Sequence, residues 1–320
     1  NNTNVYIYLE TEQSPVLTGV LKDNVINDKE KSAEGSNACV VLYYGDNAQT
    51  LRLRYGVSFI SEEQAKDNLR REQKDYEVKL LADKGRKIWN DALGKIKVNG
   101  DNDTDKTVFY TSLYRCYERP VCISEGGRYF SAFDGKVHED AGKPFFTDDW
   151  IWDTLRVMID AEEEVNIINS YLLMAEQMGN NWMPTFPEIT GDSRRMNSNH
   201  AVATVIDGYA KALKGFDLEK AYIACKKGIE EKTLIPWSGA PAGWLDEFYK
   251  EKGYIPALYP GEKETVANVS PFEKRQPIAV TLGTAYDQWC LSQIAKALGK
   301  EDEAKYYLKS SYNYRNVYNA

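Results

Sequence analysis

The sequence predicts a multidomain protein in which β-strands come first and α-helices follow. Apolar residues alternate or form β-branched runs over residues 1–60, which is typical of an antiparallel sheet. The period becomes helical over residues 61–104, and residues 105–320 carry a series of amphipathic helices. We therefore expect part of an antiparallel sheet, a helical linker and a partial domain of the α/α-toroid type.

The strands of the first segment are recognised from their alternation and their β-branched residues. The runs are VYIYLE at 5–10, ACVVLYY at 38–44 and TLRLRYGVSFI at 50–60, and Gly, Asn and Asp fill the gaps between them. We expect the other strands of this sheet to lie outside the chain.

The linker begins with a helix-start signal. Ser61 is followed three residues later by Gln64, which is a capping-box pattern, and we expect Gly85 to break the helix that follows. Downstream, the helical pattern predicts helices at 106–116, 148–159, 162–178, 199–214, 217–230, 243–252, 281–298 and 301–318. No repeat of about 34 or 40 residues recurs, so a solenoid is not expected. Long aromatic segments between paired helices favour a toroid, whose loops surround a central pocket.

Composition excludes several classes of function. The chain has 320 residues and a net charge of −8, and no basic cluster could neutralise a nucleic-acid backbone. No apolar run approaches the roughly 18 residues that a membrane helix needs. Aromatic residues make up 12 % of the chain, with 22 Tyr and 7 Trp, which suits carbohydrate binding.

The cysteine and histidine content predicts no metal site in this chain. There are 5 Cys and 2 His, no Cys-x-x-Cys pattern, and an odd cysteine count that argues against a disulfide framework. We expect buried free thiols, and we do not expect the close pair Cys116 and Cys122 to form a bridge.

The segment FFTDDWIWDTLR at 145–156 concentrates aromatic and acidic residues at an expected helix start, with Thr147 as the N-cap. Residues three and four apart share one face of a helix, and that face would carry Asp149, Trp152, Asp153 and Arg156. One interpretation is a capped helix with a surface ion pair between Asp153 and Arg156. The other is a polyol site, where carboxylates and Arg bind hydroxyls and Trp stacks on a sugar ring.

A long polar segment at 181–200 offers a second set of candidates. It contains Trp182, Asp192, Arg195 and His200. It is either an ordered surface loop or a functional loop, because long ordered loops with this content frequently carry function. His200 is expected in the first turn of the next helix, facing either a pocket or a carboxylate.

Several carboxylates could take part in glycoside hydrolysis. That chemistry needs two carboxyl groups about 5–5.5 Å apart for retention or about 6.5–9.5 Å apart for inversion. The candidates are Asp149, Asp153, Glu188, Asp192, Asp246 and Asp287, and their spacing in the sequence leaves the pair open. The Trp-rich segment 236–256 is equally compatible with an aromatic clamp and a packed turn. Gly-x-Ser-x-Gly and Gly-rich phosphate motifs are absent, which excludes the common serine hydrolase and nucleotide-binding patterns.

Several stretches together resemble one family. They are TVFYTSLYRCYERP (107–120), GRYFSAFDGKVHE (127–139), FFTDDWIWDTLR (145–156), MNSNHAVATVIDGYAKAL (196–213), GYIPA (253–257) and TLGTAYDQWCLSQIAKALGK (281–300). In this order, over nearly the whole chain, they resemble glycoside hydrolase family 92, the calcium-dependent α-mannosidases found especially in gut Bacteroidetes.

The resemblance implies a fold and an activity. Residues 1–60 would be the C-terminal part of an N-terminal β-sandwich, 61–104 a helical linker, and 105–320 part of an (α/α)6 catalytic barrel. The activity would be exo-acting, inverting hydrolysis of α-mannoside glycans assisted by Ca²⁺, in a periplasmic, secreted or cell-surface protein.

The resemblance also assigns substrate-binding roles. Asp153, in the motif W-D-T-[FL]-R, would bind hydroxyls of the terminal sugar, supported by Trp152, Arg156 and His138. The remaining expected substrate-binding residues are Asp149, Trp182, Asp192, Arg195 and His200.

The chain departs from the family pattern at two motifs. Many members read T-L-E-Y-A-Y-D-D-W where this chain has Gly283 and Gln288, and N-E-T-x-x-M-x-G-x-H where it reads GDSRRMNSNH, with Asp192 and Arg195. These differences imply an altered leaving-group side. The pair Arg194–Arg195 leads to the hypothesis of an anionic aglycone such as a mannosyl phosphate.

The acid, base and calcium-ligand motifs of the family do not occur in these 320 residues. We therefore expect the general acid, the general base and the Ca²⁺ ligands beyond Ala320, and a second fragment could complete the barrel. The alternatives are a non-catalytic carbohydrate-binding or structural relative, a mannosyl-phosphate hydrolase and, more remotely, another toroid enzyme such as a polysaccharide lyase.

Overall fold

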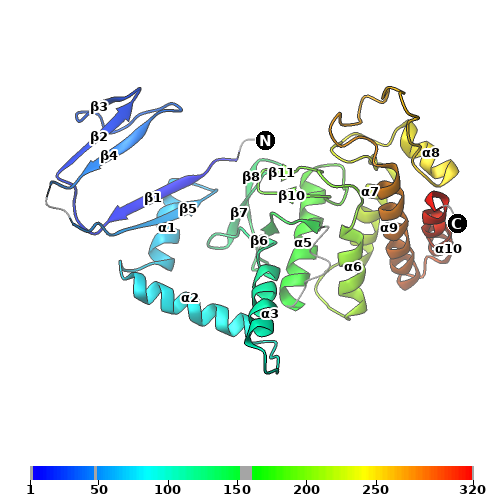
Figure 1. The fold of residues 1–320 in the computed structure, drawn as a ribbon, viewed down its shortest axis with the longest axis horizontal. Coiled ribbons are helices and arrows are strands. Elements are labelled where there is room, and N and C mark those ends of the chain that lie inside the picture. Colours follow the sequence, from blue (N-terminus) through cyan, green and yellow to red (C-terminus); the bar gives the residue numbers. More distant parts are fainter. Residues whose placement is uncertain (1–2, 47–48, 152–160, 319–320) are drawn as a thin grey trace. The chain divides into compact units, whose positions relative to one another are not determined.

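The computed structural model describes residues 3–46, 49–151 and 161–318. The chain divides into two compact units (Figure 1). One unit is Asn4–Lys97, which we call the strand unit. The other is Val98–Ala320 with the N-terminal residues through Thr3, which we call the helical unit.

The strand unit contains antiparallel pairs. Strand β1 (Tyr6–Thr11) pairs with β5 (Leu53–Ser58), and β2 (Leu17–Lys22) pairs with both β3 (Val25–Asn27) and β4 (Cys39–Tyr43). The three predicted strands are confirmed as β1, β4 and β5, with slightly different ends.

The hairpin between β2 and β3 was missed by the sequence interpretation. Its two connecting residues, Asp23 and Asn24, both have a positive φ, of 50° and 63°. Two such residues in a row match the twist of a hairpin, and Asp and Asn are among the side chains that tolerate this conformation. The Asp-Asn pair was therefore the available signal.

Helix α1 (Glu62–Glu72) begins where the sequence predicts. The Ser61 hydroxyl accepts a hydrogen bond from the Gln64 amide at 3.1 Å, which caps the helix. The helix packs on β5 so closely that a Cβ atom added to Gly56 would lie 2.1 Å from the Ala65 carbonyl oxygen. Gly56 therefore allows the contact between α1 and β5.

Helix α2 (Val78–Leu93) continues through Gly85, so the expected break there is wrong. Glycine costs only about 1 kcal/mol inside a helix and does not by itself end one.

The helical unit follows the predicted order, except that most of the helix expected at 148–159 lies outside the described residues. Its helices are α3 (Asp103–Cys116), α5 (Ala161–Gln177), α6 (Ala201–Ala210), α7 (Leu218–Glu230), α8 (Trp244–Lys252), α9 (Pro277–Ala297) and α10 (Glu301–Ser310), then the 3₁₀ helix η1 (Ser311–Val317). Helix α6 ends earlier than expected, and Ala212, with φ 58°, lies in the left-handed region just after it. The last predicted helix is divided, because its final turns form η1.

The core of the helical unit is built around α6. This helix contacts α5, α7 and α9, which lie side by side in Figure 1. Ala201 and Ala203 on α6, and Ala221 and Ala224 on α7, are completely buried. Small side chains at these positions allow the helices to approach closely.

Short strands hold the segments between the helices. Strand β6 (Val121–Cys122) pairs with β9 (Phe146–Thr147), β7 (Arg128–Ser131) with β8 (Lys136–Glu139), and β10 (Pro187–Glu188) with β11 (Gly191–Asp192). The prediction of Thr147 as a helix N-cap is wrong, because Thr147 belongs to β9. Its hydroxyl donates to the Glu188 carbonyl at 3.2 Å, and the next three residues, 148–150, are not helical.

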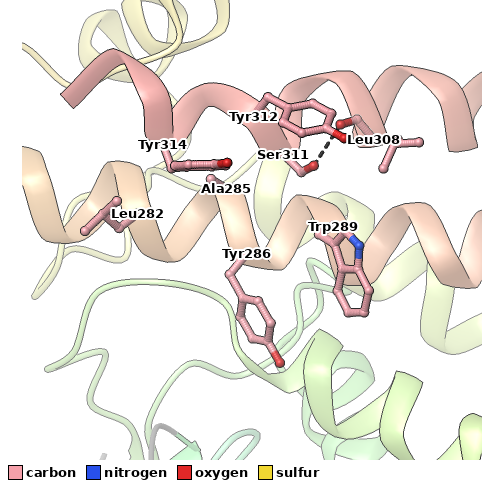
Figure 2. A pocket seen from close by; sticks show the side chains of 8 residues that line it. All are labelled: Leu282, Ala285, Tyr286, Trp289, Leu308, Ser311, Tyr312 and Tyr314. Carbon is pink, nitrogen blue, oxygen red and sulfur yellow. Dashed lines mark hydrogen bonds between the residues drawn. The ribbon is translucent and has the colours of Figure 1, made fainter. Parts of the chain in front are cut away.

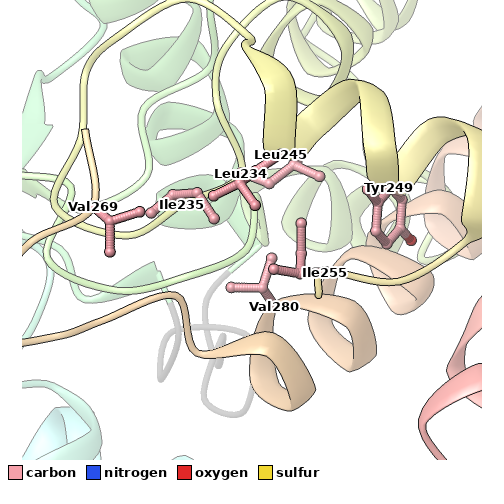
Figure 3. Close-up of a cluster of buried hydrophobic side chains, with 7 residues drawn as sticks. All are labelled: Leu234, Ile235, Leu245, Tyr249, Ile255, Val269 and Val280. Carbon is pink, nitrogen blue, oxygen red and sulfur yellow. The ribbon is translucent and has the colours of Figure 1, made fainter. Parts of the chain in front are cut away.

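A cluster of buried apolar side chains anchors the long connection between α7 and α9 (Figure 3). It combines residues that precede α8, that lie on α8, that follow α8 and that lie in the first turn of α9. The cluster consists of Leu234, Ile235, Leu245, Tyr249, Ile255, Val269 and Val280. The connection is therefore a packed part of the unit.

All five cysteines lie in the described part of the chain, and all are free. Cys225 and Cys290 are buried as expected, whereas Cys39 and Cys122 are exposed and Cys116 is half-buried. Within the described residues, no helix is long and apolar enough to cross a membrane.

Candidate functional site

The predicted residues Trp152, Asp153 and Arg156 lie outside the described residues, so the structure is informative about the segment just before them. Asp149 is completely buried and accepts a hydrogen bond from the Tyr171 hydroxyl on α5. Burial, together with the charge of Asp149, raises the pKa of Tyr171 well above its ordinary value, so the phenol remains a donor. Asp149 therefore fixes the segment to α5.

The same segment is joined to β10. The Asp149 amide donates to the Pro187 carbonyl at 2.9 Å, next to the bond from Thr147 to Glu188. Asp148 forms an ion pair with Arg119, and the Arg119 guanidinium lies 4.4 Å from the centre of the Trp150 ring. We call residues 145–150 and 185–195, together with the contacts that join them, the loop wall.

Trp150 completes the loop wall. Its ring also stacks on Phe186, with 6.0 Å between ring centres, and 42 % of the residue remains exposed. The crowding of acids and aromatics in FFTDDW therefore has a physical explanation. One acid pairs with Arg119, one binds Tyr171, and the tryptophan packs against Arg119 and Phe186.

Asp192 holds the loop at 185–194 in shape. Its carboxylate accepts hydrogen bonds from the amides of Thr185 at 3.1 Å and Phe186 at 2.8 Å, and from the Arg194 side chain at 3.3 Å. Arg195 forms an ion pair with Glu188 at 3.0 Å. The long polar segment is thus ordered by its own carboxylates.

His200 faces a carboxylate, which resolves one of the open alternatives. Its Nδ1 atom lies 2.6 Å from one oxygen of Asp287, and the Asn199 amide donates to the other oxygen at 2.5 Å. Asp287 is completely buried on α9, and Tyr286 from the same helix meets the His200 ring edge-on. Asp287 therefore holds the start of α6 and fixes the orientation of His200.

Ser198 and Gly283 fit together on the adjacent turn of α9. A Cβ atom on Gly283 would lie 1.7 Å from the Ser198 hydroxyl oxygen, and Ser198 has a positive φ of 76°. The Ser198 hydroxyl donates to the Asn197 side chain at 2.9 Å, and Asn197 donates to Gln276 at 2.6 Å. The space that a larger residue at position 283 would fill is thus occupied by the Ser198 side chain.

His138 and Trp182 have separate contacts. His138, on β8, lies 2.9 Å from an Asp134 oxygen and stacks on Tyr129, which in turn stacks on Phe145. Trp182 is largely buried, and its indole N–H donates to Glu231 at 3.2 Å. His138 therefore supports the start of the 145–150 segment through Tyr129, whereas Trp182 is tied to the end of α7.

Most of the candidate carboxylates act as anchors. Asp246 accepts from the amides of Leu234 at 2.7 Å and Gly243 at 2.8 Å, as Asp192 and Asp287 accept from other amides. The oxygens of these carboxylates are occupied by backbone amides, so these side chains serve to hold the chain in place. Among the described residues, no group of three or more His, Cys, Asp or Glu side chains could hold a metal ion.

A separate aromatic pocket of about 380 Å³ lies between α9, α10 and η1 (Figure 2). Tyr286 and Trp289 line it from α9, and Tyr312 and Tyr314 line it from η1. Burial is the main cause that raises the pKa of Tyr286 to about 12, so this hydroxyl is neutral at physiological pH. The sequence signal was the helical spacing of Leu282, Ala285, Tyr286 and Trp289 along α9.

The fold and the loop wall define a class of protein. A helical unit whose ordered polar loops carry half-exposed tryptophans beside charged side chains has the features of a carbohydrate-active protein. Residues 64–320 match the glycosyl hydrolase family 92 catalytic domain, and the chain belongs to this family.

Solved structures agree with this assignment. The chain is similar to a family GH92 inverting mannosidase from Bacteroides thetaiotaomicron, with 28 % identity and a TM-score of 0.83, over 98 % of this chain and 41 % of that chain. A family GH92 α-mannosidase from the same organism has the same fold, with 23 % identity, a TM-score of 0.79 and the same coverage.

A curated relative points in the same direction. It is described as an uncharacterized secreted glycosidase of Arthroderma benhamiae and is 24 % identical over 275 residues, which are 83 % of this chain and 30 % of the relative. The chain therefore spans less than half the length of the relatives that it matches.

Proposed function

We propose that these 320 residues form part of an exo-acting, inverting α-mannosidase, and that the loop wall binds the terminal mannose. The observation that carries the proposal is the set of bonds that joins Asp149 and Thr147 to β10 in a chain of this family. These bonds fix the residues directly before Trp152 and Asp153. A fixed starting point is what a sugar-binding side chain needs for a defined orientation.

The proposed roles of Asp153, Arg156 and Trp152 rest on the family resemblance. Asp153 and Arg156 bind sugar hydroxyls, and Trp152 packs on the apolar face of the ring. Asp149 and Asp192 are positioning residues, because their oxygens hold Tyr171 and the loop amides. His200 is oriented by Asp287.

The catalytic groups and the metal belong to the proposal as well. In the part of the chain that the structure describes, no cluster of three or more His, Cys, Asp or Glu side chains could hold a metal ion. We place the Ca²⁺ ligands, the general acid and the general base beyond Ala320, in further chain or in a second fragment that completes an (α/α)6 barrel. The secreted relative supports a location outside the cytoplasm.

The mannosyl-phosphate alternative finds less support. Arg194 is paired with Asp192, and Arg195 is paired with Glu188, so both guanidinium charges are already balanced by a carboxylate. A site for a phosphate normally offers unpaired positive charge. A non-catalytic carbohydrate-binding relative is the alternative that requires an experiment.

The test combines binding and turnover. Calorimetric titration of the chain with mannose should show binding that Asp153→Asn reduces at least tenfold, whereas the exposed acid variant Asp103→Asn should bind as the unaltered chain does. Mannose release from α-mannobiose by a protein that continues beyond Ala320, lost with EDTA, would establish the enzyme. The same release by these 320 residues alone would contradict the placement of the catalytic groups beyond Ala320. Binding without release would favour a carbohydrate-binding relative or the need for a second fragment, and absence of binding would contradict the proposed site.

A further inference from the structure

The most unusual exposed aromatic side chain of the helical unit is Trp237. It is 47 % exposed, and its backbone has a positive φ of 62°. A bulky residue rarely adopts this conformation, and such strain persists only where the surroundings impose it. The Trp237 amide donates a hydrogen bond to the Arg194 carbonyl at 2.7 Å, which holds this residue against the 185–195 segment.

The base of the Trp237 loop is rigid. Residues 231–242 form a narrow loop, with bonds from the Thr233 amide to Ala240 at 3.0 Å and from the Ala242 amide to Glu231 at 2.7 Å. Leu234 and Ile235, directly before the loop tip, lie in the buried cluster of Figure 3. An apolar anchor therefore stands two residues from an exposed tryptophan.

The loop tip is fixed to the loop wall from a second side. A Cβ atom on Gly239 would lie 1.3 Å from an Arg194 guanidinium nitrogen, so the Arg194 side chain occupies the space beside Gly239. Arg195 lies with its guanidinium carbon 5.6 Å from the centre of the Trp237 ring while it pairs with Glu188. Arg195, a residue of the loop wall, thus contacts both the Trp237 ring and Glu188.

We propose that Trp237, with the Arg195–Glu188 pair at its edge, is a stacking platform for the second, neutral sugar of an α-mannoside glycan. The proposal rests on the proposed function, because it adds a neighbouring subsite to that site. An exposed indole ring offers the apolar surface on which a sugar ring stacks, and the polar edge of an Arg–Glu pair can bind its hydroxyls. The pair has no net charge, which favours a neutral sugar over a phosphate.

The experiment measures sugar binding by the whole chain with isothermal titration calorimetry. The ligands are mannose, which reaches only the terminal site, and α-1,2-, α-1,3- and α-1,6-linked mannobiose, which reach both. Trp237→Ala should lower the affinity for at least one mannobiose roughly five- to tenfold, the loss expected for one aromatic contact, and leave mannose unchanged. Trp237→Phe should restore most of the affinity, because a ring remains.

Trp89→Ala in the strand unit is the matched control, since Trp89 is also exposed, at 37 %. Unchanged affinity of Trp237→Ala for all three disaccharides would overturn the platform while mannose binding upheld the proposed function. Equal loss for mannose and mannobiose would place Trp237 at the terminal site and would also overturn it. Failure of the unaltered chain to bind any of these sugars would contradict the proposed function and the platform together.

Discussion

In the helical unit, several acidic side chains lie in the interior and several tryptophans lie at the surface, which is the reverse of their usual distribution. Asp149 and Asp287 are completely buried, whereas Trp150 and Trp237 are nearly half exposed. Charged residues are seldom fully buried unless they are paired, and these acids are paired with amides, a phenol or an imidazole. The difference indicates that the acids hold the loops and that the tryptophans are available to ligands.

The strongest test of this comparison removes a buried anchor. Asp287→Ala leaves the Asn199 amide and the His200 ring without their shared acceptor, so we expect the free energy of unfolding of the helical unit to fall by about 3–5 kcal/mol. Denaturant titration followed by circular dichroism measures it. Asp103→Ala, an acid on the surface of α3, is the control and should change little; a loss below about 1 kcal/mol at Asp287 would break the comparison.

The buried lysine Lys232, in contrast to the buried acids, should destabilise the fold. Burial lowers the pKa of Lys232 to about 8, partly opposed by Asp192 and Asp287, and Arg194 lowers it further. The unfolded chain, with an ordinary lysine pKa, then binds more protons between about pH 8 and 10.5, so stability rises with pH across that window.

Lys232→Met should remove this rise in stability with pH. It should also stabilise the unit at pH 7 by about 2 kcal/mol, a figure that allows for the lost hydrogen bond to Thr185. Unfolding measured from pH 7 to 10.5 gives both quantities. Lys227→Met, which changes a partly exposed lysine, should keep the slope. A Lys232→Met variant with the unaltered slope would show that Lys232 is not the titrating group.

An acid in the connection before α9 extends the comparison to low pH. Arg275 binds both Glu264 oxygens, at 2.6 and 2.8 Å, and chiefly this bonding lowers the pKa of Glu264 to about 2. Because the folded-state pKa is below the ordinary value of 4.5, the pair stabilises the fold above pH 4.5 and loses this effect as the pH falls toward 2.

We expect the unaltered chain to lose on the order of 2 kcal/mol over this range, allowing for partial exposure of Glu264. Glu264→Gln should lack that part of the loss, whereas Glu251→Gln, at an exposed pair, should retain it. Thermal unfolding between pH 2 and 5 compares the three proteins, and parallel curves would argue against an anchoring role.

The smallest expected effect is on the other side of the comparison. Trp237→Ala should change the free energy of unfolding by less than about 1 kcal/mol, because the ring is about half exposed and lies against the Arg195 guanidinium at the surface. The same denaturant titration measures it. A loss of 3 kcal/mol would mean that Trp237 is a packing residue, and the division between anchors and exposed aromatics would fail.

Much of the fold could be predicted because it is recorded in local patterns. Alternation along β1 and β5 and the helical period of α5, α7 and α9 identify these elements, and the Ser61 cap marks the start of α1. The helix ends were less predictable. A single residue in the left-handed region, such as Asp148 or Ala212, redirects the chain, and propensity does not reveal it.

The site was predicted only as a set of residues. Asp192, Asp246 and Asp287 were expected to be candidates for chemistry, yet each accepts hydrogen bonds from backbone amides. The partner of Asp287 lies 88 residues earlier, and no spacing rule connects Asn199 to Asp287. The sequence identifies Trp237 only as part of a Trp-rich segment, because its positive φ and its contact with Arg195 arise from tertiary structure.

The fit between Ser198 and Gly283 couples two positions that lie far apart in the sequence. A Cβ atom at position 283 would lie 1.7 Å from the Ser198 hydroxyl oxygen, so no residue larger than glycine fits there while Ser198 keeps its place. A larger side chain at 283 requires the Ser198 side chain to rotate away or to be replaced, so variants at these two positions have to be made and interpreted as a pair.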